Sequence, residues 1–149
     1  MTTLYQKIII ATDGTEYAKK AVNTAVTLSK LTGAKLYGVY VSDVSNITPT
    51  SIEWEVVAEN IKREADAALS YVCETAKAEQ ICFESVNLSG SAAQEIVQYA
   101  NTIEADLIIV GAAGKKTIER ILLGSVSEKV IRNAKQQVLV VKSPNTENE

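Results

Sequence analysis

Residues 106–125 read DLIIVGAAGKKTIERILLGS and join a short apolar run to a glycine-rich segment with two adjacent lysines. The run Leu107–Val110 has the length and the branched aliphatic content of a strand that is buried on both faces. Gly111, Gly114 and Gly124 follow it, and Ser125 comes directly after the last glycine. Bare backbone beside positive charge indicates a phosphate group as the bound species, whereas an ordinary turn is the alternative explanation for the glycines.

Four other apolar runs are similar to this strand, and longer segments with helical spacing separate them. The predicted strands are Lys7–Thr12, Lys35–Val41, Cys82–Leu88, Asp106–Val110 and Val138–Lys142. Apolar residues recur at helical spacing in four segments that begin near Ala18, Trp54, Ile96 and Val126. Alternating strands and helices predict an α/β fold, in which parallel strands carry helices on both faces.

Three helix ends carry a recognisable signal. Gly33 is placed to end the first helix, because glycine readily adopts the left-handed conformation of a helix stop. Ser91 is placed to open the third helix. Ser125 and Glu128 have the spacing of a capping box, so we expect the fourth helix to begin with Ser125 as its cap.

In a parallel sheet of this class, ligands bind beyond the carboxyl ends of the strands, where the strand order reverses. Asp13, Val41, Gly90 and Gly111 lie at or just after the ends of four predicted strands and are therefore candidates. Asp13 has two explanations, a carboxylate that holds a metal ion or a ribose, or a cap for the first helix. Its place at a strand tip favours the first. The long polar connection Ser42–Ser51 is expected to form a mobile loop or lid.

The composition restricts the classes of function. The chain has 149 residues, of which 46% are hydrophobic and 22% charged, as is typical of one soluble globular domain. A net charge of −3 argues against a nucleic-acid binder, and no apolar run is long enough to span a bilayer. There is no recognisable signal peptide, and Cys73 and Cys82 lack metal-ligand spacing, so we expect a cytoplasmic location. Because there is no histidine, Ser-His-Asp and Cys-His catalysis and histidine metal sites are excluded.

The glycine spacing excludes two familiar phosphate-binding motifs. A P-loop with Gly114 and Lys115 as its Gly-Lys pair would need a glycine at position 109 and Ser or Thr at position 116. The chain has Ile109 and Lys116 there. A dinucleotide fingerprint beginning at Gly111 would need glycine in place of Ala113. A different arrangement is therefore required if this segment binds a phosphate.

A physical interpretation fits the spacing that is present. Gly111 turns the chain off the strand, and Gly114 allows its backbone to approach an anion closely. Gly124 and Ser125 lie at a helix N-terminus, where free N–H groups and the helix dipole attract a phosphate. The alternative is that Gly111 and Gly114 form a tight turn while Ser125 only caps a helix.

The sequence resembles the universal stress protein family over nearly its whole length. The nucleotide-binding members carry Gly-x2-Gly-x9-Gly-(Ser/Thr), which Gly111, Gly114, Gly124 and Ser125 match in full. KIIIATDGTEYAKKA at 7–21, DLIIVGAAG at 106–114 and ILLGSVSEKVIRNAKQQVLVV at 121–141 are similar to the family's first, fourth and last units. We expect a universal stress protein domain over residues 1–142 and a disordered tail over 143–149.

The resemblance implies an adenine nucleotide alpha hydrolase-like fold, an open five-stranded parallel sheet in the order 3-2-1-4-5. ATP, with Mg or Mn, would lie across the strand tips of a homodimer. The implied nucleotide contacts are Gly111, Gly114, Gly124 and Ser125 for phosphates and ribose, Ala11, Thr12 and Asp13 near the adenosine, the Val41 backbone for adenine, and Val126. The implied dimer strand contains Val138, Leu139, Val140 and Val141. Ala112 and Ala113 stand where many relatives have a polar pair, which removes side-chain donors near the phosphates.

Three functions remain open at this point. We favour an ATP-binding regulatory module in the stress response, because the glycine motif is intact and no catalytic base or nucleophile is recognisable. A slow metal-dependent ATPase would have to use Asp13 and Lys115. A nucleotide-independent dimerising scaffold is the third.

Two structural expectations are added. An unpaired edge strand as apolar as Val138–Val141 would invite aggregation, so a homodimer is also expected on physical grounds. Ser127 is expected at an exposed helix position.

Overall fold

A computed structural model describes residues 4–43, 54–112 and 123–142 of the chain. The strands in this part are β1 (Lys7–Ala11), β2 (Lys35–Ser42), β3 (Phe83–Ser89), β4 (Leu107–Gly111) and β5 (Gln137–Val141). The helices are η1 (Glu16–Ala18), a short 3₁₀ turn, and α1 (Lys19–Thr32), α2 (Trp54–Ala78), α3 (Ala92–Ile103) and α4 (Ser125–Asn133). Each predicted strand is present, and its limits differ from the expected ones by at most one residue at either end.

The strands form one parallel sheet in the order β3-β2-β1-β4-β5, which confirms the expected fold. Ala11, the last residue of β1, pairs with Val39 of β2 on one side and with Val110 of β4 on the other. The chain passes from β1 outward to β2 and β3, and then returns to place β4 on the opposite side of β1. The strand order therefore reverses at the carboxyl end of β1, which is where sheets of this class bind ligands.

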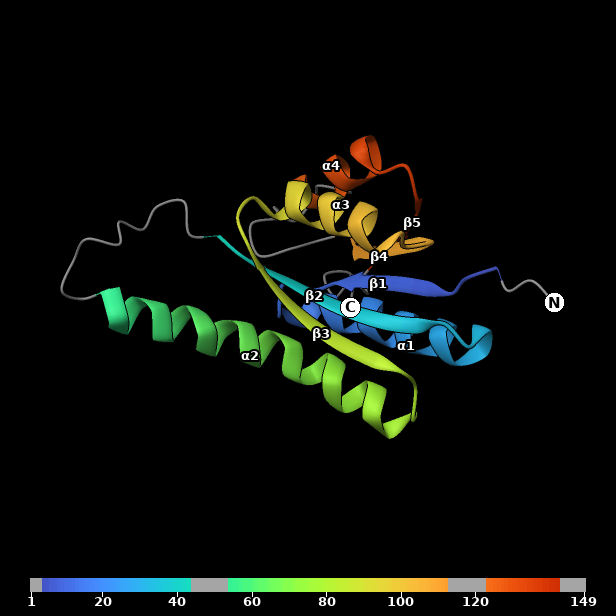
Figure 1. Ribbon diagram of the computed structural model, residues 1–149, viewed down its shortest axis with the longest axis horizontal. Helices are drawn as coiled ribbons and strands as arrows, with labels where there is room; N and C mark the ends of the chain where they lie inside the picture. The colour runs from blue at the N-terminus through green and yellow to red at the C-terminus, as the bar shows by residue number, and fades with distance from the viewer. Residues whose placement is uncertain (1–3, 44–53, 113–122, 143–149) are drawn as a thin grey trace, which may run out of the picture.

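Helices cover both faces of the sheet, with α1 and α2 on one side and α3 and α4 on the other (Figure 1). Side chains of β1 pack into the cores on both faces of the sheet, because successive side chains of a strand point to opposite faces. Ile8 and Ile10 belong to the core beneath α1, whereas Ile9 belongs to the core beneath α3 and α4. All three side chains are fully buried, which explains why β1 reads as a continuous apolar run.

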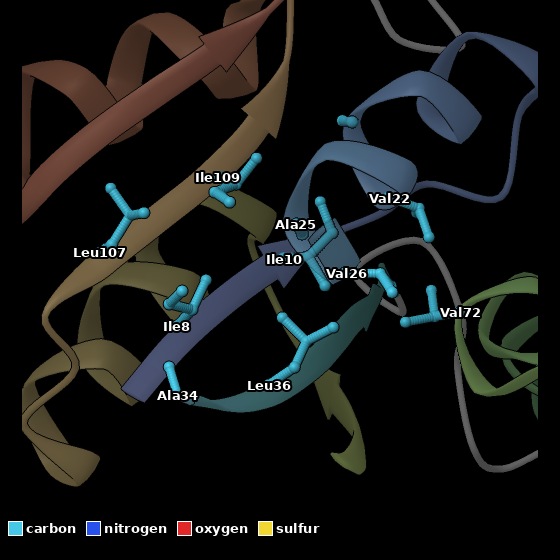
Figure 2. Close-up of a cluster of buried hydrophobic side chains, with 11 residues drawn as sticks. Ile8, Ile10, Val22, Ala25, Val26, Ala34, Leu36, Val72, Leu107 and Ile109 are labelled. Atoms are coloured by element: carbon cyan, nitrogen blue, oxygen red, sulfur yellow. The ribbon is translucent and has the colours of Figure 1, made fainter. Parts of the chain in front are cut away.

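The core on the α1 side is built from small and branched side chains. Figure 2 shows Ile8 and Ile10 of β1, Leu36 of β2, and Leu107 and Ile109 of β4 facing α1. The α1 residues in this core are Ala21, Val22, Ala25 and Val26, and Val72 of α2 completes it. This packing fixes α1, and hence the turn that connects it to β1, against the rigid centre of the sheet.

The helix ends agree with the sequence at two of three positions. Gly33 ends α1 in the left-handed conformation, with φ of 78°, and Ser91 is the N-cap residue of α3. The predicted capping box at α4 is wrong, since the N-cap residue is Gly124 and Ser125 is already the first helical residue. The extended backbone of Gly124 (φ −72°, ψ 163°) provides the helix entry, so the Ser125 side chain is not needed for it.

Several predictions fall on residues outside the described ranges. Gly114, Lys115, most of the expected Ser42–Ser51 loop and the 143–149 tail are among them. Ser42 itself belongs to β2 and is buried. In the ranges that the structure covers, no helix is both long enough and apolar enough to cross a membrane.

Candidate functional site

The turn after β1 lies at the centre of the candidate site. The Thr12 amide donates to the Val39 carbonyl of β2 over 3.0 Å, and the Thr12 hydroxyl oxygen accepts the Gly14 amide over 3.1 Å. Asp13 is half-buried, and its Oδ1 accepts the amide and the hydroxyl of Thr15 at 3.0 and 2.6 Å. Asp13 therefore stabilises the turn that leads into η1, but it does not cap a helix, because the N-cap residues of η1 and α1 are Thr15 and Ala18. This does not exclude the ligand role, because a carboxylate has about four acceptor sites.

Gly14 is required by two features of this turn. Its φ of +80° lies in the left-handed region, and a Cβ placed on it would come within 2.9 Å of the Ala68 Cβ of α2. A cleft of about 280 Å³ opens beside it between α1 and α2. The Lys19 ammonium at its rim lies 3.0 Å from a Glu16 carboxylate oxygen and 5.1 Å from the centre of the Tyr71 ring. Glu16 and Tyr71 thus hold the Lys19 ammonium in place beside this cleft.

Val41 extends beyond the tip of β1. The pairing of β2 with β1 stops at Val39, whereas its pairing with β3 continues to Ser42. The carbonyl of Val39 faces β1 and that of Ser42 faces β3, so by alternation the N–H and C=O of Val41 also face the β1 side. Within the described residues no strand lies opposite them there. The backbone of Val41 therefore presents a donor and an acceptor above the tip of β1.

Ser42 holds this end of β2 in place, and sequence reasoning did not single it out. Its side chain is buried, and its hydroxyl donates to Asn87 Oδ1 over 3.2 Å. Its carbonyl accepts the Gly90 amide over 2.9 Å. A serine beside a polar connection carries no sequence signal of burial, because its partners lie far along the chain.

The ends of the glycine segment meet at the tip of β4. The Gly124 amide donates to the Ala112 carbonyl over 2.6 Å, and the Ala112 amide donates to the Val141 carbonyl over 2.9 Å. The Ser127 hydroxyl makes a short hydrogen bond to the Gly111 carbonyl. Two sequence expectations are corrected here. The Gly124 N–H is not free for a ligand, and Ser127 is buried rather than exposed.

The N-terminus of α4 lies at the same edge of the sheet, beside the tip of β4. We call the region at the tips of β1 and β4, between Val41 and the start of α4, the mouth of the sheet. The first hydrogen bond within the helix runs from the Glu128 amide to the Gly124 carbonyl over 3.0 Å. The amides of Ser125, Val126 and Ser127 therefore have no acceptor inside the helix. Ser125 and Val126 are exposed to solvent, and Val126 retains 39% of its accessible surface. These amides and the helix dipole form a region that attracts anions.

The two described groups whose pKa values are shifted, Lys35 and Tyr99, lie outside this region. The pKa of Lys35 is raised, chiefly by its hydrogen bond to Glu84, and the pKa of Tyr99 is raised, chiefly by burial. Lys35 begins β2, at the opposite end of the sheet from the tips of β1 and β4. No cluster of three or more Cys, Asp or Glu side chains able to hold a metal ion occurs among the residues that the structure covers.

The structure brings most predicted site residues to one edge. Ala11, Thr12 and Asp13 lie between Val41 on the β2 side and Gly111 on the β4 side, and Gly124, Ser125 and Val126 begin the helix that starts beside the tip of β4. Gly114 lies outside the described residues. A doubly wound parallel sheet with open backbone groups and a helix N-terminus at the reversal point is typical of the nucleotide-binding class of α/β proteins.

Comparison with known proteins identifies the family. The model of the universal stress protein family matches residues 4–142, and the chain belongs to this family. Universal stress protein MJ0531 of Methanocaldococcus jannaschii is 42% identical over 146 residues, which cover 97% of this chain and 86% of that protein.

Two solved structures have the same architecture. The hypothetical protein MJ0577 superposes with a TM-score of 0.86 at 28% identity, over 96% of this chain and 99% of that one. A universal stress protein solved in complex with cAMP superposes with a TM-score of 0.72 at 28% identity, over 96% of this chain and all of the other.

Proposed function

We propose that this protein binds ATP at the carboxyl edge of its sheet and acts as a nucleotide-dependent regulatory module in the stress response. The observation that carries the proposal is the convergence of open backbone groups around the tip of β1. Val41 offers a donor and an acceptor on one side, and the α4 amides lie on the other. Such groups recognise a base edge and a phosphate chain, respectively, without any charged side chain.

The adenosine end of ATP fits the β2 side of the mouth. An adenine edge carries a donor next to an acceptor, which complements the N–H and C=O of Val41. Ala11 and Thr12 lie beside it at the tip of β1, and Asp13, the next residue, would accept a hydrogen bond from a ribose hydroxyl. Thr15 already orients the Asp13 carboxylate through two hydrogen bonds.

The phosphates fit the β4 side of the mouth. Ser125 and Val126 are exposed residues at the N-terminus of α4, and the dipole of the helix adds a partial positive charge there. Gly111 and Gly114 would complete the phosphate contacts through their backbone. The similar protein solved with cAMP, a phosphorylated adenosine, supports an adenine nucleotide as the ligand class.

A divalent cation would be held mainly by the nucleotide. Mg²⁺ is commonly bound through one or two carboxylates together with substrate phosphates. Asp13 is the carboxylate at the strand tip, and the described residues contain no ligand cluster that would bind the metal by itself. The residues present therefore fit Mg or Mn that arrives with ATP, where it would neutralise phosphate charge.

Calorimetric titration with ATP, adenosine and inorganic triphosphate, each with Mg²⁺, tests the proposal. We expect ATP to bind more tightly than either fragment, because it engages both sides of the mouth. Absence of ATP binding up to millimolar concentration would rule the proposal out. It would favour the competing function, a nucleotide-independent scaffold, for which the internal hydrogen bond of the Gly124 amide is a specific argument.

The proposal includes a homodimer through β5. Val138, Leu139, Val140 and Val141 are all half-buried, and among the residues that the structure describes β5 pairs with β4 alone. The Val141 carbonyl accepts the Ala112 amide, so the polar groups of Val138 and Val140 face outward by alternation. A two-fold axis would pair these groups with the same groups of a second copy. The other edge strand, β3, exposes Glu84, Ser85, Asn87 and Ser89 instead.

A proline substitution separates strand pairing from folding. Val140→Pro removes an outward N–H that the β4–β5 ladder does not use, so the fold should persist while the dimer is lost. We expect sedimentation at micromolar concentration to give the mass of a monomer. Ser85→Pro, at an outward position of β3, is the matched control and should remain dimeric. A dimeric Val140→Pro protein would contradict this interface.

The cytoplasmic location is also part of the proposal. Cys73 and Cys82 are unpaired, which suits a reducing compartment.

A further inference from the structure

Ser127 occupies an unusual position for a polar side chain. It lies in the first turn of α4, yet it retains only 5% of its accessible surface. Val130, one helical turn further on, is completely buried and packs in the core beneath α3 and α4. The two side chains lie on the same inner face of the helix. An apolar residue would suit this face, so the hydroxyl of Ser127 requires an explanation.

The hydrogen bond of this hydroxyl provides the explanation. Ser127 donates its single hydroxyl proton to the carbonyl of Gly111, the last residue of β4. A second bond, from the Gly124 amide to the Ala112 carbonyl, lies directly beside it. The end of β4 and the start of α4 are therefore joined at two adjacent positions. Of these two bonds, only that of Ser127 depends on a side chain.

We propose that Ser127 is a positioning residue, whose hydroxyl clamps the first turn of α4 to the end of β4 and thereby sets the amides that receive phosphate. This inference rests on the proposed function. A helix terminus attracts an anion only in the direction in which its first N–H groups point, and the attraction falls off within one turn. The clamp fixes that direction relative to Asp13 and Val41 before the ligand arrives, so less ordering is required on binding.

Substitution of Ser127 has a predictable and selective effect on binding. Ser127→Ala removes the clamp and leaves the Gly111 carbonyl without this donor. We expect ATP to bind about tenfold more weakly, while adenosine, which lacks phosphates, binds within about twofold of the wild-type value. Ser127→Thr retains the hydroxyl and should restore most of the ATP affinity.

Val130→Ala is the matched control for loss of packing. It creates a cavity on the same buried face of α4 and lowers the stability, but it leaves the hydroxyl in place. We expect it to leave the ratio of ATP affinity to adenosine affinity unchanged. A loss that is equal for ATP and adenosine in Ser127→Ala would overturn the positioning role. So would a Ser127→Thr protein as impaired as Ser127→Ala.

Amide hydrogen exchange tests the clamp without any ligand. In Ser127→Ala the Gly124 amide, which donates to Ala112, should exchange at least about tenfold faster than in the wild type. The Thr12 amide, which donates to Val39 in the central ladder, should be unaffected. Unchanged protection of Gly124 would refute the clamp even if ATP binding were lost. If the wild-type protein does not bind ATP, the proposed function fails, and the exchange result alone decides whether the clamp exists.

Discussion

The two ends of the sheet differ in how far side chains occupy their backbone polar groups. At the amino end, Asp106 Oδ2 accepts the amides of Gln6 and Lys7 at 2.8 and 3.0 Å, and the Lys7 ammonium donates to the Ile103 carbonyl over 2.8 Å. Tyr5 donates to the Gln137 side chain over 2.7 Å, which links the residues before β1 to β5. Side chains thus occupy the backbone groups that this end of the sheet would otherwise leave open.

At the carboxyl end, side chains occupy only some of the backbone groups, such as the Gly111 carbonyl, which accepts the Ser127 hydroxyl. The backbone of Val41 faces a position that no described strand fills. The first amides of α4 have no acceptor within the helix. Unsatisfied backbone groups cost stability when they are buried, so they are retained only where water or a ligand reaches them. The comparison indicates that side chains complete the sheet at the amino end, whereas the carboxyl end keeps the backbone groups that the proposed ligand would use.

The largest expected effect is on stability at the amino end. Asp106→Ala removes both hydrogen bonds to the amides of Gln6 and Lys7. We expect the free energy of unfolding, measured in urea, to fall by about 2–3 kcal/mol, because bonds to a charged acceptor are the stronger kind. The ATP dissociation constant of the folded protein should change by less than about twofold. A large loss of ATP affinity at full folding would break the division between the two ends.

The next effect is at the carboxyl end and has opposite signs for stability and binding. Ser125→Glu places a negative charge at the first position of α4, where the dipole stabilises it by about 0.3–1 kcal/mol. The same charge repels a phosphate, so ATP should bind on the order of thirtyfold more weakly, about 2 kcal/mol. Gln94→Glu, in the first turn of α3, is the matched control and should leave ATP affinity unchanged. Unaltered ATP binding by Ser125→Glu would place the phosphates elsewhere.

A smaller effect is expected at Val41, whose backbone rather than side chain is proposed to bind the adenine. Val41→Pro removes the N–H that faces the β1 side, while Tyr40 and Ser42 keep the ladder with β3. We expect adenosine and ATP to bind about tenfold more weakly, as calorimetry would measure, with a modest change in stability. Ser85→Pro removes an outward N–H of β3 and should not affect binding. Equal affinities for Val41→Pro and the wild type would remove the base from this edge.

The fold could be predicted from the sequence because its signals are local. Continuous short runs such as KIIIA suit strands that are buried on both faces, and the longer periodic segments between them suit helices. Gly33 indicated the end of α1 because its left-handed conformation is an intrinsic property of the residue. Most of the candidate site followed as well, since parallel strands bring their carboxyl ends to one edge.

The parts of the site that the sequence did not reveal depend on partners far apart in the chain. Ser127 and Ser42 read as surface residues, but Gly111 and Asn87 satisfy their hydroxyls inside the protein. The expected Ser125 cap was wrong because the extended backbone of Gly124 begins the helix by itself. The amide of Gly124, which was expected to be free, donates to the carbonyl of Ala112, a residue that lies far from it along the chain.

The sequence by itself determined the elements, their order and the edge of the sheet that is open, because each follows from residue spacing along a few turns or strand positions. Only the tertiary structure decided which backbone groups at that edge are already satisfied. That outcome depends on which distant residues come within hydrogen-bond reach, as Val39 does for Thr12 and Ala112 does for Gly124. A hydrogen bond requires a defined distance and direction, and no local pattern of residues specifies either across the sheet.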